Sequence, residues 1–431
     1  MDTLGRYNND LQQLLGNSDR LEPTRRKRQL VLPSLFEQFR KQASSFHDAI
    51  CRSVLCDCSS THATKLLLPR HDRVATSQSD DTTESLRLQV CFPRKQQSWS
   101  SSHTLLGPED DWYTANIEMA DAGQDNELEP TITNMSTATG SILLGVETRE
   151  TMQSTRKVSF QSDRRRSSFT VPKDAIKIDD LCAALKDYDL AKPHLGYLQG
   201  QDNYCHTIYH SKTAVPGVHD IHDSITLGEH IRRYEQEPLV GSATRALRRK
   251  ERLEVALIMA KILLQLFQCP WLNEDWSKED LVFFRDRDGS LLLETLSLDT
   301  DFYPKSVSFV PRSQSSGSDV NLDRKRAKAS LLSLGVLVLE LWFYKSLESR
   351  PFRSKYLGPT GLENEFTRFN TAQVWQEQAL EEGGIDLDTL TYRCIHGDFG
   401  TSRQDLNDEE LRKAVYCEVV QPLEKILARY E

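Results

Sequence analysis

Residues 331–343 read LLSLGVLVLELWF, and the rest of the chain is interpreted outward from this stretch. Only Ser333 and Glu340 interrupt its apolar residues, so no polar face is left. A helix that is apolar on all sides is expected at the centre of a large folded unit. The stretch is too short to cross a bilayer, which requires about 20 residues. We therefore predict a buried central helix and no transmembrane segment.

The elements that precede and follow this helix have a characteristic order. An amphipathic helix begins near Ser242 and keeps apolar residues at helical spacing as far as Phe267. A polar loop over residues 272–281 comes next, followed by a hairpin with its turn at 285–289. The apolar helix and a last amphipathic helix complete the series. This order resembles that of the C-lobe of a protein kinase.

Residues 272–281 (LNEDWSKEDL) fall where kinases carry the catalytic loop H-R-D-L-x-x-x-N. Asp275 falls on the aspartate that accepts the proton of the substrate hydroxyl, and Asp280 falls on the asparagine that binds Mg²⁺. A carboxylate at Asp280 still offers an oxygen ligand to the ion. Asn273 and Glu274 replace the histidine and arginine of the motif. The loop therefore keeps only part of a phosphotransferase motif.

The remaining parts of a phosphotransferase are missing from the sequence. No G-x-G-x-x-G motif lies upstream to cover phosphates, and no V-A-I-K-like strand supplies a lysine. We therefore predict an α+β, predominantly helical, degenerate protein-kinase-like fold that binds no cofactor. Its predicted function is that of a non-catalytic (pseudokinase) regulatory or protein-interaction module. The alternative is a divergent Mg-dependent phosphotransferase with Asp275 as base and Asp280 as metal ligand.

Composition divides the chain into three predicted segments. Residues 1–75 form a helical hairpin, because two apolar stripes at helical spacing are joined by a basic connection. Residues 76–175 are rich in Ser and Thr, which favours partly disordered loops on a few strands. Residues 176–431 form the kinase-like, mostly helical domain. Ser159 and Ser168 follow basic residues and are candidate phosphorylation sites, with a plain polar loop as the alternative.

The cysteines permit a metal site as an alternative interpretation. Nine cysteines, an odd number, favour reduced thiols over a disulfide framework. Cys51, Cys56, Cys58 and His62 carry side chains that can bind Zn²⁺. Their spacing, C-x4-C-x-C-x3-H, differs from the C-x2-C pairs of usual zinc modules. The sequence therefore favours small buried cysteines at a helix end, with no metal, over a zinc site.

Charge and the N-terminal residues indicate the class of protein and its compartment. The chain has 54 Lys and Arg against 63 Asp and Glu, a formal net charge of −9. This balance excludes a protein that is basic overall and binds nucleic acid through that charge. Residues 1–25 lack the basic start and apolar run of a secretory signal. We predict a cytoplasmic protein with a protein partner and no nucleic acid.

Several short motifs are spread over nearly the whole chain. They are Cys56-Asp57-Cys58 after the opening helices, Asp180-Leu181-Cys182, Leu195-Gly196-Tyr197-Leu198, Pro270-Trp271-Leu272, Ser333-Leu334-Gly335-Val336 and Val419-Val420-Gln421-Pro422-Leu423-Glu424. Together they resemble a family of fungal proteins with a domain of unknown function, often found behind HeLo-type prion-inhibition domains. The resemblance implies a role in fungal non-self recognition or cell-death signalling. It also implies a C-terminal half like a decayed kinase.

Overall fold

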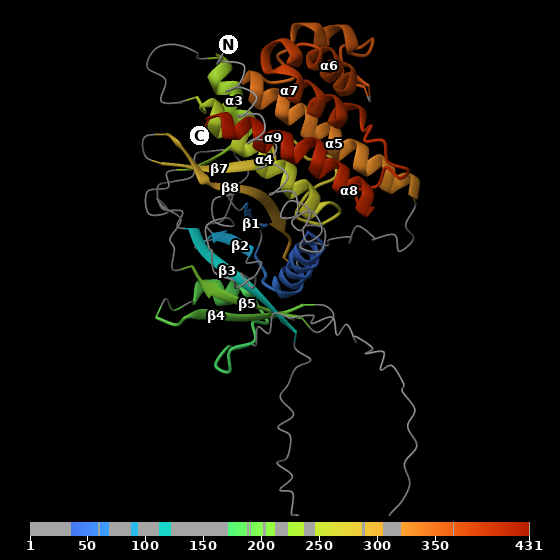
Figure 1. Cartoon of the computed structure of the whole chain (residues 1–431). Helices are drawn as coiled ribbons and strands as arrows, with labels where there is room; N and C mark the ends of the chain where they lie inside the picture. The colour runs from blue at the N-terminus through green and yellow to red at the C-terminus, as the bar shows by residue number, and fades with distance from the viewer. Residues whose placement is uncertain are drawn as a thin grey trace, which may run out of the picture.

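One main apolar core joins the sheet and the helices of the described part of the chain. The computed structural model describes residues 36–58, 61–68, 88–93, 112–121, 171–187, 189, 191–200, 204–211, 223–236, 246–286, 289–304, 320–364 and 366–430. Most of the helices stack beside β7 and β8, at one end of the sheet (Figure 1). Side chains from both layers therefore exclude water from the same interior.

Eight strands form a single antiparallel sheet that curls into a half-barrel. In chain order they are β1 His62–Leu67, β2 Leu88–Pro93, β3 Trp112–Asp121, β4 His194–Gln199, β5 Tyr204–His210, β6 Asp223–Thr226, β7 Leu281–Arg285 and β8 Leu291–Phe302. Across the sheet the order is β4-β5-β3-β2-β1-β8-β7-β6. Leu66 of β1 pairs with Val90 on one side and Leu298 on the other, and all three are buried. The middle of the sheet is thus fixed by apolar residues on its core face.

The predicted kinase-like, predominantly helical fold is wrong. The hairpin predicted after residue 280 exists as β7 and β8, but β8 also pairs with the whole of β1, from His62↔Phe302 to Leu67↔Ser297. The hairpin is therefore part of one curled, all-antiparallel sheet of eight strands, and does not belong to a separate helical lobe. The linear order of elements was right for this region, but order alone does not determine which sheet a hairpin joins.

The sheet takes strands from all three predicted segments of the chain. β1 lies within residues 1–75, β2 and β3 lie within 76–175, and the other strands lie within 176–431. β2 overlaps a strand that alternation predicts over residues 86–92, of which the structure describes the part from residue 88. β3 lies in an acidic stretch where the sequence predicts no strand, yet it pairs with β2 and β5 near the centre of the sheet.

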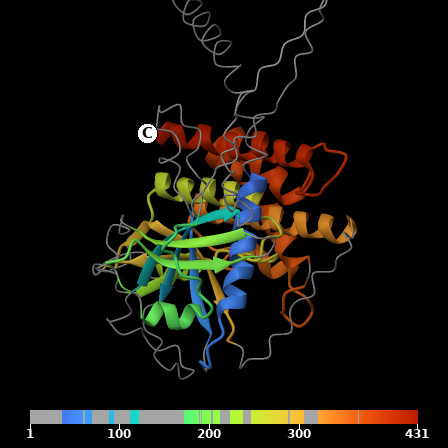
Figure 2. The ribbon, with the colours of Figure 1, turned by 90° about the horizontal axis from the view of Figure 1, so that it is seen from below.

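Some predictions fall on residues that the structure does not describe. Ser159 and Ser168, the candidate phosphorylation sites, lie outside the described residues, as do residues 1–35. Of the predicted N-terminal hairpin the structure describes one helix, over residues 36–53. This 36–53 helix crosses the sheet (Figure 2).

The other helices form the layer that covers one side of the core, except for α2, which lies apart from them beside the 36–53 helix and β1. They are α2 Leu181–Lys186, α3 Leu227–Gln236, α4 Arg249–Leu266, α5 Val320–Phe343, α6 Thr367–Gln376, α7 Ala379–His396, α8 Glu409–Val415 and α9 Gln421–Leu427, with a π-helical turn at Tyr416–Val420 and 3-10 turns at Pro351–Tyr356 and Ala428–Tyr430. α5 contains the predicted central helix and packs between α4 and α7. In the described ranges, no helix combines the length and apolarity needed to cross a membrane.

Two polar or small residues in α5 have specific packing roles. A Cβ atom at Gly335 would lie 2.9 Å from Cγ1 of Ile395, so glycine permits α7 to approach closely. Glu340 is fully buried and accepts a hydrogen bond from Nζ of Lys278, in the loop before β7. Glu348 binds the same ammonium group at 2.6 Å. The buried carboxylate of Glu340 is thus paired, as burial of a charge requires.

Candidate metal centre

The 36–53 helix ends close to the start of β1. Phe46 and Ile50 face the core, and Nε1 of Trp271 donates a hydrogen bond to the Ala43 carbonyl at 2.9 Å. The helix is therefore anchored against the chain that follows α4. Residues 54–58 leave it without regular structure and carry Cys56 and Cys58 past the end of the helix.

His62 is the first residue of β1. It pairs with Phe302 at the end of β8, so the ladder on that side fixes the position of its backbone. Its side chain is half-buried, and burial lowers the pKa of the imidazole, as does the charge of Lys186. The ring is consequently neutral at pH 7, which is the form that binds metal ions.

α2 brings a cysteine from a distant part of the chain to the same place. The Asp180 carboxylate caps this short helix and accepts a hydrogen bond from the backbone N–H of Cys182 at 2.9 Å. Just before the helix, the N–H of Ile178 donates to the carbonyl of Tyr197 in β4 at 2.8 Å. The cap and the link to the sheet edge together orient Cys182 toward β1.

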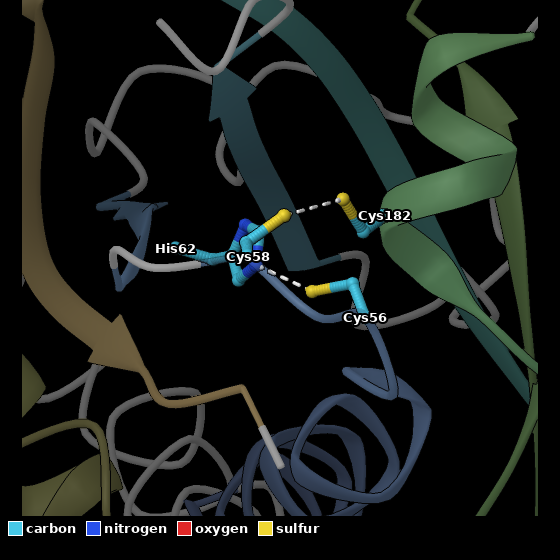
Figure 3. Close-up of side chains that lie close together, drawn as sticks. All are labelled: Cys56, Cys58, His62 and Cys182. Carbon is cyan, nitrogen blue, oxygen red and sulfur yellow. Dashed lines mark hydrogen bonds between the residues drawn. The ribbon is translucent and has the colours of Figure 1, made fainter. Parts of the chain in front are cut away.

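Four side chains from these three elements converge (Figure 3). The ligand atoms of Cys56, Cys58, His62 and Cys182 all lie within 4.8 Å of one another. Sγ of Cys56 is 2.9 Å from Nε2 of His62, and Sγ of Cys58 is 3.7 Å from Sγ of Cys182. Among the residues described, this is the one group of at least three His, Cys, Asp or Glu side chains that could share a metal ion.

The distances fit a single tetrahedral Zn²⁺. With Zn–S bonds of about 2.3 Å, two sulfur ligands at tetrahedral angles lie about 3.8 Å apart. The Cys58–Cys182 separation of 3.7 Å matches this edge. The corresponding S–N edge is about 3.6 Å, so Cys56 and His62, now 2.9 Å apart, would separate slightly around an ion. Three sulfurs and one imidazole are a donor set typical of closed, structural zinc sites.

The charges of the site also suit a divalent cation. Burial, together with the neighbouring sulfurs of Cys58 and Cys56, raises the pKa of the Cys182 thiol to about 12. Without a cation, the thiols of Cys56 and Cys182 hold their protons at pH 7, and binding of a metal ion would displace those protons. Three thiolates and one Zn²⁺ carry a net charge of −1. The exposed ammonium group of Lys186, near the sulfurs of Cys182 and Cys58, offsets that charge.

Three of these four residues are candidate ligands in the sequence, and the fourth, Cys182, could not be predicted from it. Cys51, the other cysteine of the predicted pattern, does not take part, since its Sγ lies 3.7 Å from Nδ1 of His47 within the same helix. Cys182 is 124 residues from Cys58, its neighbour in the cluster. The number of residues between two cysteines so far apart does not predict that their side chains meet. In the sequence, Asp180-Leu181-Cys182 stands out only as one of the motifs that carry the family resemblance.

The two predicted phosphotransferase residues lie elsewhere, in the loop before β7. Oδ2 of Asp280 accepts hydrogen bonds from the backbone N–H of Ser277 at 2.8 Å and from its hydroxyl at 3.4 Å. Asp275 is exposed on the same loop, which contacts α5 through the hydroxyl of Ser330 and the carbonyl of Glu274. Asp280 therefore stabilises a turn, and between the two acids Lys278 points into the core.

The described part of the chain thus defines a mixed α and β protein with a candidate Cys₃His metal centre. A family model described as a domain of unknown function (DUF7580) matches residues 33–430, and the chain belongs to this family. No curated protein matches the chain, and no solved structure does.

Proposed function

We propose that the protein is a non-catalytic protein-interaction module. Its fold is stabilised by one Zn²⁺ bound to Cys56, Cys58, His62 and Cys182. The observation that carries the proposal is the convergence of four sulfur and nitrogen ligands from three separate elements within 4.8 Å. The donor set predicts a structural site, because all four tetrahedral positions are filled by protein.

The ion would join parts of the fold that are weakly connected without it. α2 has only six residues, and a helix of that length is not stable by itself. Residues 54–58 have no regular structure. A metal bound between them links α2 to the end of the 36–53 helix and to the start of β1. The free energy of metal binding then adds to the stability of the folded state.

The biological setting is proposed from the resemblance. The motifs shared with fungal proteins found behind HeLo-type domains support a role in non-self recognition or cell-death signalling, in which the module would bind a protein partner. The sequence supports the non-catalytic part of the proposal, because it has no phosphate-binding glycine loop and no V-A-I-K-like lysine.

Metal analysis of the purified protein tests the zinc site. We expect about one Zn²⁺ per chain in the wild-type protein and a large loss of zinc in Cys182→Ser, because the variant removes one of four ligands. Cys51→Ser is the matched control, since Cys51 lies near the site but outside the cluster, and it should keep its zinc. Wild-type zinc content in Cys182→Ser, or no zinc in the wild-type protein, would contradict the proposal.

A thermal-shift titration with MgATP tests the non-catalytic part. Because Asp280 is engaged by Ser277, we expect no rise in Tm at millimolar nucleotide. A rise that is lost in Asp280→Ala would show that the loop binds Mg-nucleotide. That result would favour a phosphotransferase.

A further inference from the structure

We propose that the metal centre has a second, oxidised state in which Cys58 and Cys182 form a disulfide and Zn²⁺ is released. The inference rests on the proposed zinc site and adds its regulation by a peroxide oxidant. In both states the segment after the 36–53 helix stays linked to α2, first by the ion and then by a covalent bond.

The arrangement of the sulfur atoms selects this pair. Sγ of Cys58 lies 3.7 Å from Sγ of Cys182. Sγ of Cys56 also interacts with both of these sulfurs, but it is held by Nε2 of His62, 2.9 Å away. Figure 3 shows the two contacts side by side, each between residues of different segments. A disulfide bond is about 2.05 Å long, so the two sulfurs must approach by about 1.7 Å. A shift of that size is small for a segment without regular structure, such as residues 54–58.

The two cysteines differ in access to an oxidant. Cys58 is partly exposed, while the side chain of Cys182 is buried within the cluster. The sulfur of Cys58 is therefore the one that a small peroxide reaches first. Cys182 is placed behind it as the resolving thiol, which is the arrangement found in peroxide-sensitive cysteine pairs.

The chemistry balances with hydrogen peroxide as the oxidant. The thiolate of Cys58 attacks one peroxide oxygen, the O–O bond breaks, and hydroxide leaves, so that Cys58 becomes a sulfenic acid. The thiolate of Cys182 then attacks the sulfur of Cys58, forming the S–S bond and expelling a second hydroxide. The two sulfurs together lose two electrons, which the peroxide gains. The two hydroxides that form are then protonated to water. Cys56 and His62 alone are too few ligands to hold the ion.

The two states would have different consequences for the fold. The disulfide would close a long loop, since 124 residues separate its two cysteines. Such a cross-link reduces the conformational entropy of the unfolded chain. Oxidation would thus remove the metal without freeing α2 from the N-terminal segment. What changes is the environment of Cys56 and His62, which lose their ion and keep only their contact with each other and with the protein.

The test uses the full chain, purified with zinc, in a background of Cys51→Ser and Cys417→Ser, which removes the two exposed cysteines. Hydrogen peroxide is added in the presence of a zinc-binding dye, and the protein is then analysed by intact mass and peptide mapping. We expect release of about one Zn²⁺ per chain, loss of two hydrogens, and a cross-linked peptide that joins Cys58 to Cys182. Dithiothreitol and zinc should restore the starting state.

Two ligand variants separate this inference from the zinc site itself. Cys56→Ser weakens the metal site but keeps the pair, so peroxide should still form the disulfide, but more slowly, because without the ion the Cys182 thiol holds its proton. Cys58→Ala should give neither bound zinc nor a cross-link. Zinc that stays bound under peroxide, or that leaves while Cys58 and Cys182 remain unlinked, would overturn the inference. A wild-type protein without zinc before peroxide is added would instead overturn the proposed function.

Discussion

His230 is buried in the core of the described part of the chain, at 1% exposure, and neither ring nitrogen has a hydrogen-bond partner there. Its ring lies edge-on to that of Tyr344, with ring centres 6.2 Å apart. Burial lowers the pKa of the imidazole to about 4, and the charges of Arg285 and Arg233 act in the same direction. The unfolded chain takes up this proton near pH 6.5 and the native protein only near pH 4. Stability is therefore lost as the pH falls through this window.

We expect His230→Phe to make the protein less sensitive to acid, because phenylalanine keeps the ring contact and cannot be protonated. Between pH 7 and pH 5 the wild-type histidine should cost about 2 kcal/mol of unfolding free energy. Urea unfolding at the two pH values measures this difference, with His47→Gln as the control at a partly exposed histidine. An unchanged pH dependence in His230→Phe would show that another group is responsible.

Among individual residues, the candidate metal ligands could be predicted only in part from the sequence. Cys56, Cys58 and His62 lie within a few residues of one another, so the sequence alone predicts that their side chains are close in space. Cys182 joins them only because the edge of the sheet and the cap at Asp180 place α2 beside β1. That placement depends on tertiary contacts. The sequence alone therefore favoured buried cysteines without a metal.

Helices were the elements that the sequence predicted best. The stripe of α4 and the apolar stretch in α5 are local signals, and both segments are buried helices in the structure. Strands were harder, because their stability comes from partners that are distant in sequence. β3 carries polar residues such as Glu118 between apolar ones and lies in an acidic stretch. Its pairing with β2 and β5 fixes it as a strand.

Glu340 shows how one element depends on another. As the single acid in the apolar stretch 331–343, it would be expected to destabilise α5. The ammonium group of Lys278, from the loop before β7, neutralises it, and the backbone N–H of Leu347 donates a further hydrogen bond at 2.8 Å. The loop that looked like a catalytic motif therefore has a packing role that its similarity to that motif did not reveal.

For the whole molecule, the order of elements gave the wrong fold. The helix, polar loop, hairpin and apolar helix follow one another as predicted, and the loop does contact α5. The error arose because β1, β2 and β3, from the first part of the chain, complete the sheet that the hairpin joins. A sheet built from strands far apart in sequence cannot be deduced from the local pattern of either half.

The same long-range assembly creates the candidate metal centre, where the first part of the chain meets α2. X-ray absorption at the zinc K-edge of the purified protein tests this most directly. The predicted spectrum has three sulfur neighbours at about 2.3 Å and one nitrogen at about 2.0–2.1 Å. A zinc shell made only of oxygen and nitrogen would show that the ion binds elsewhere, and the proposed centre would then be wrong.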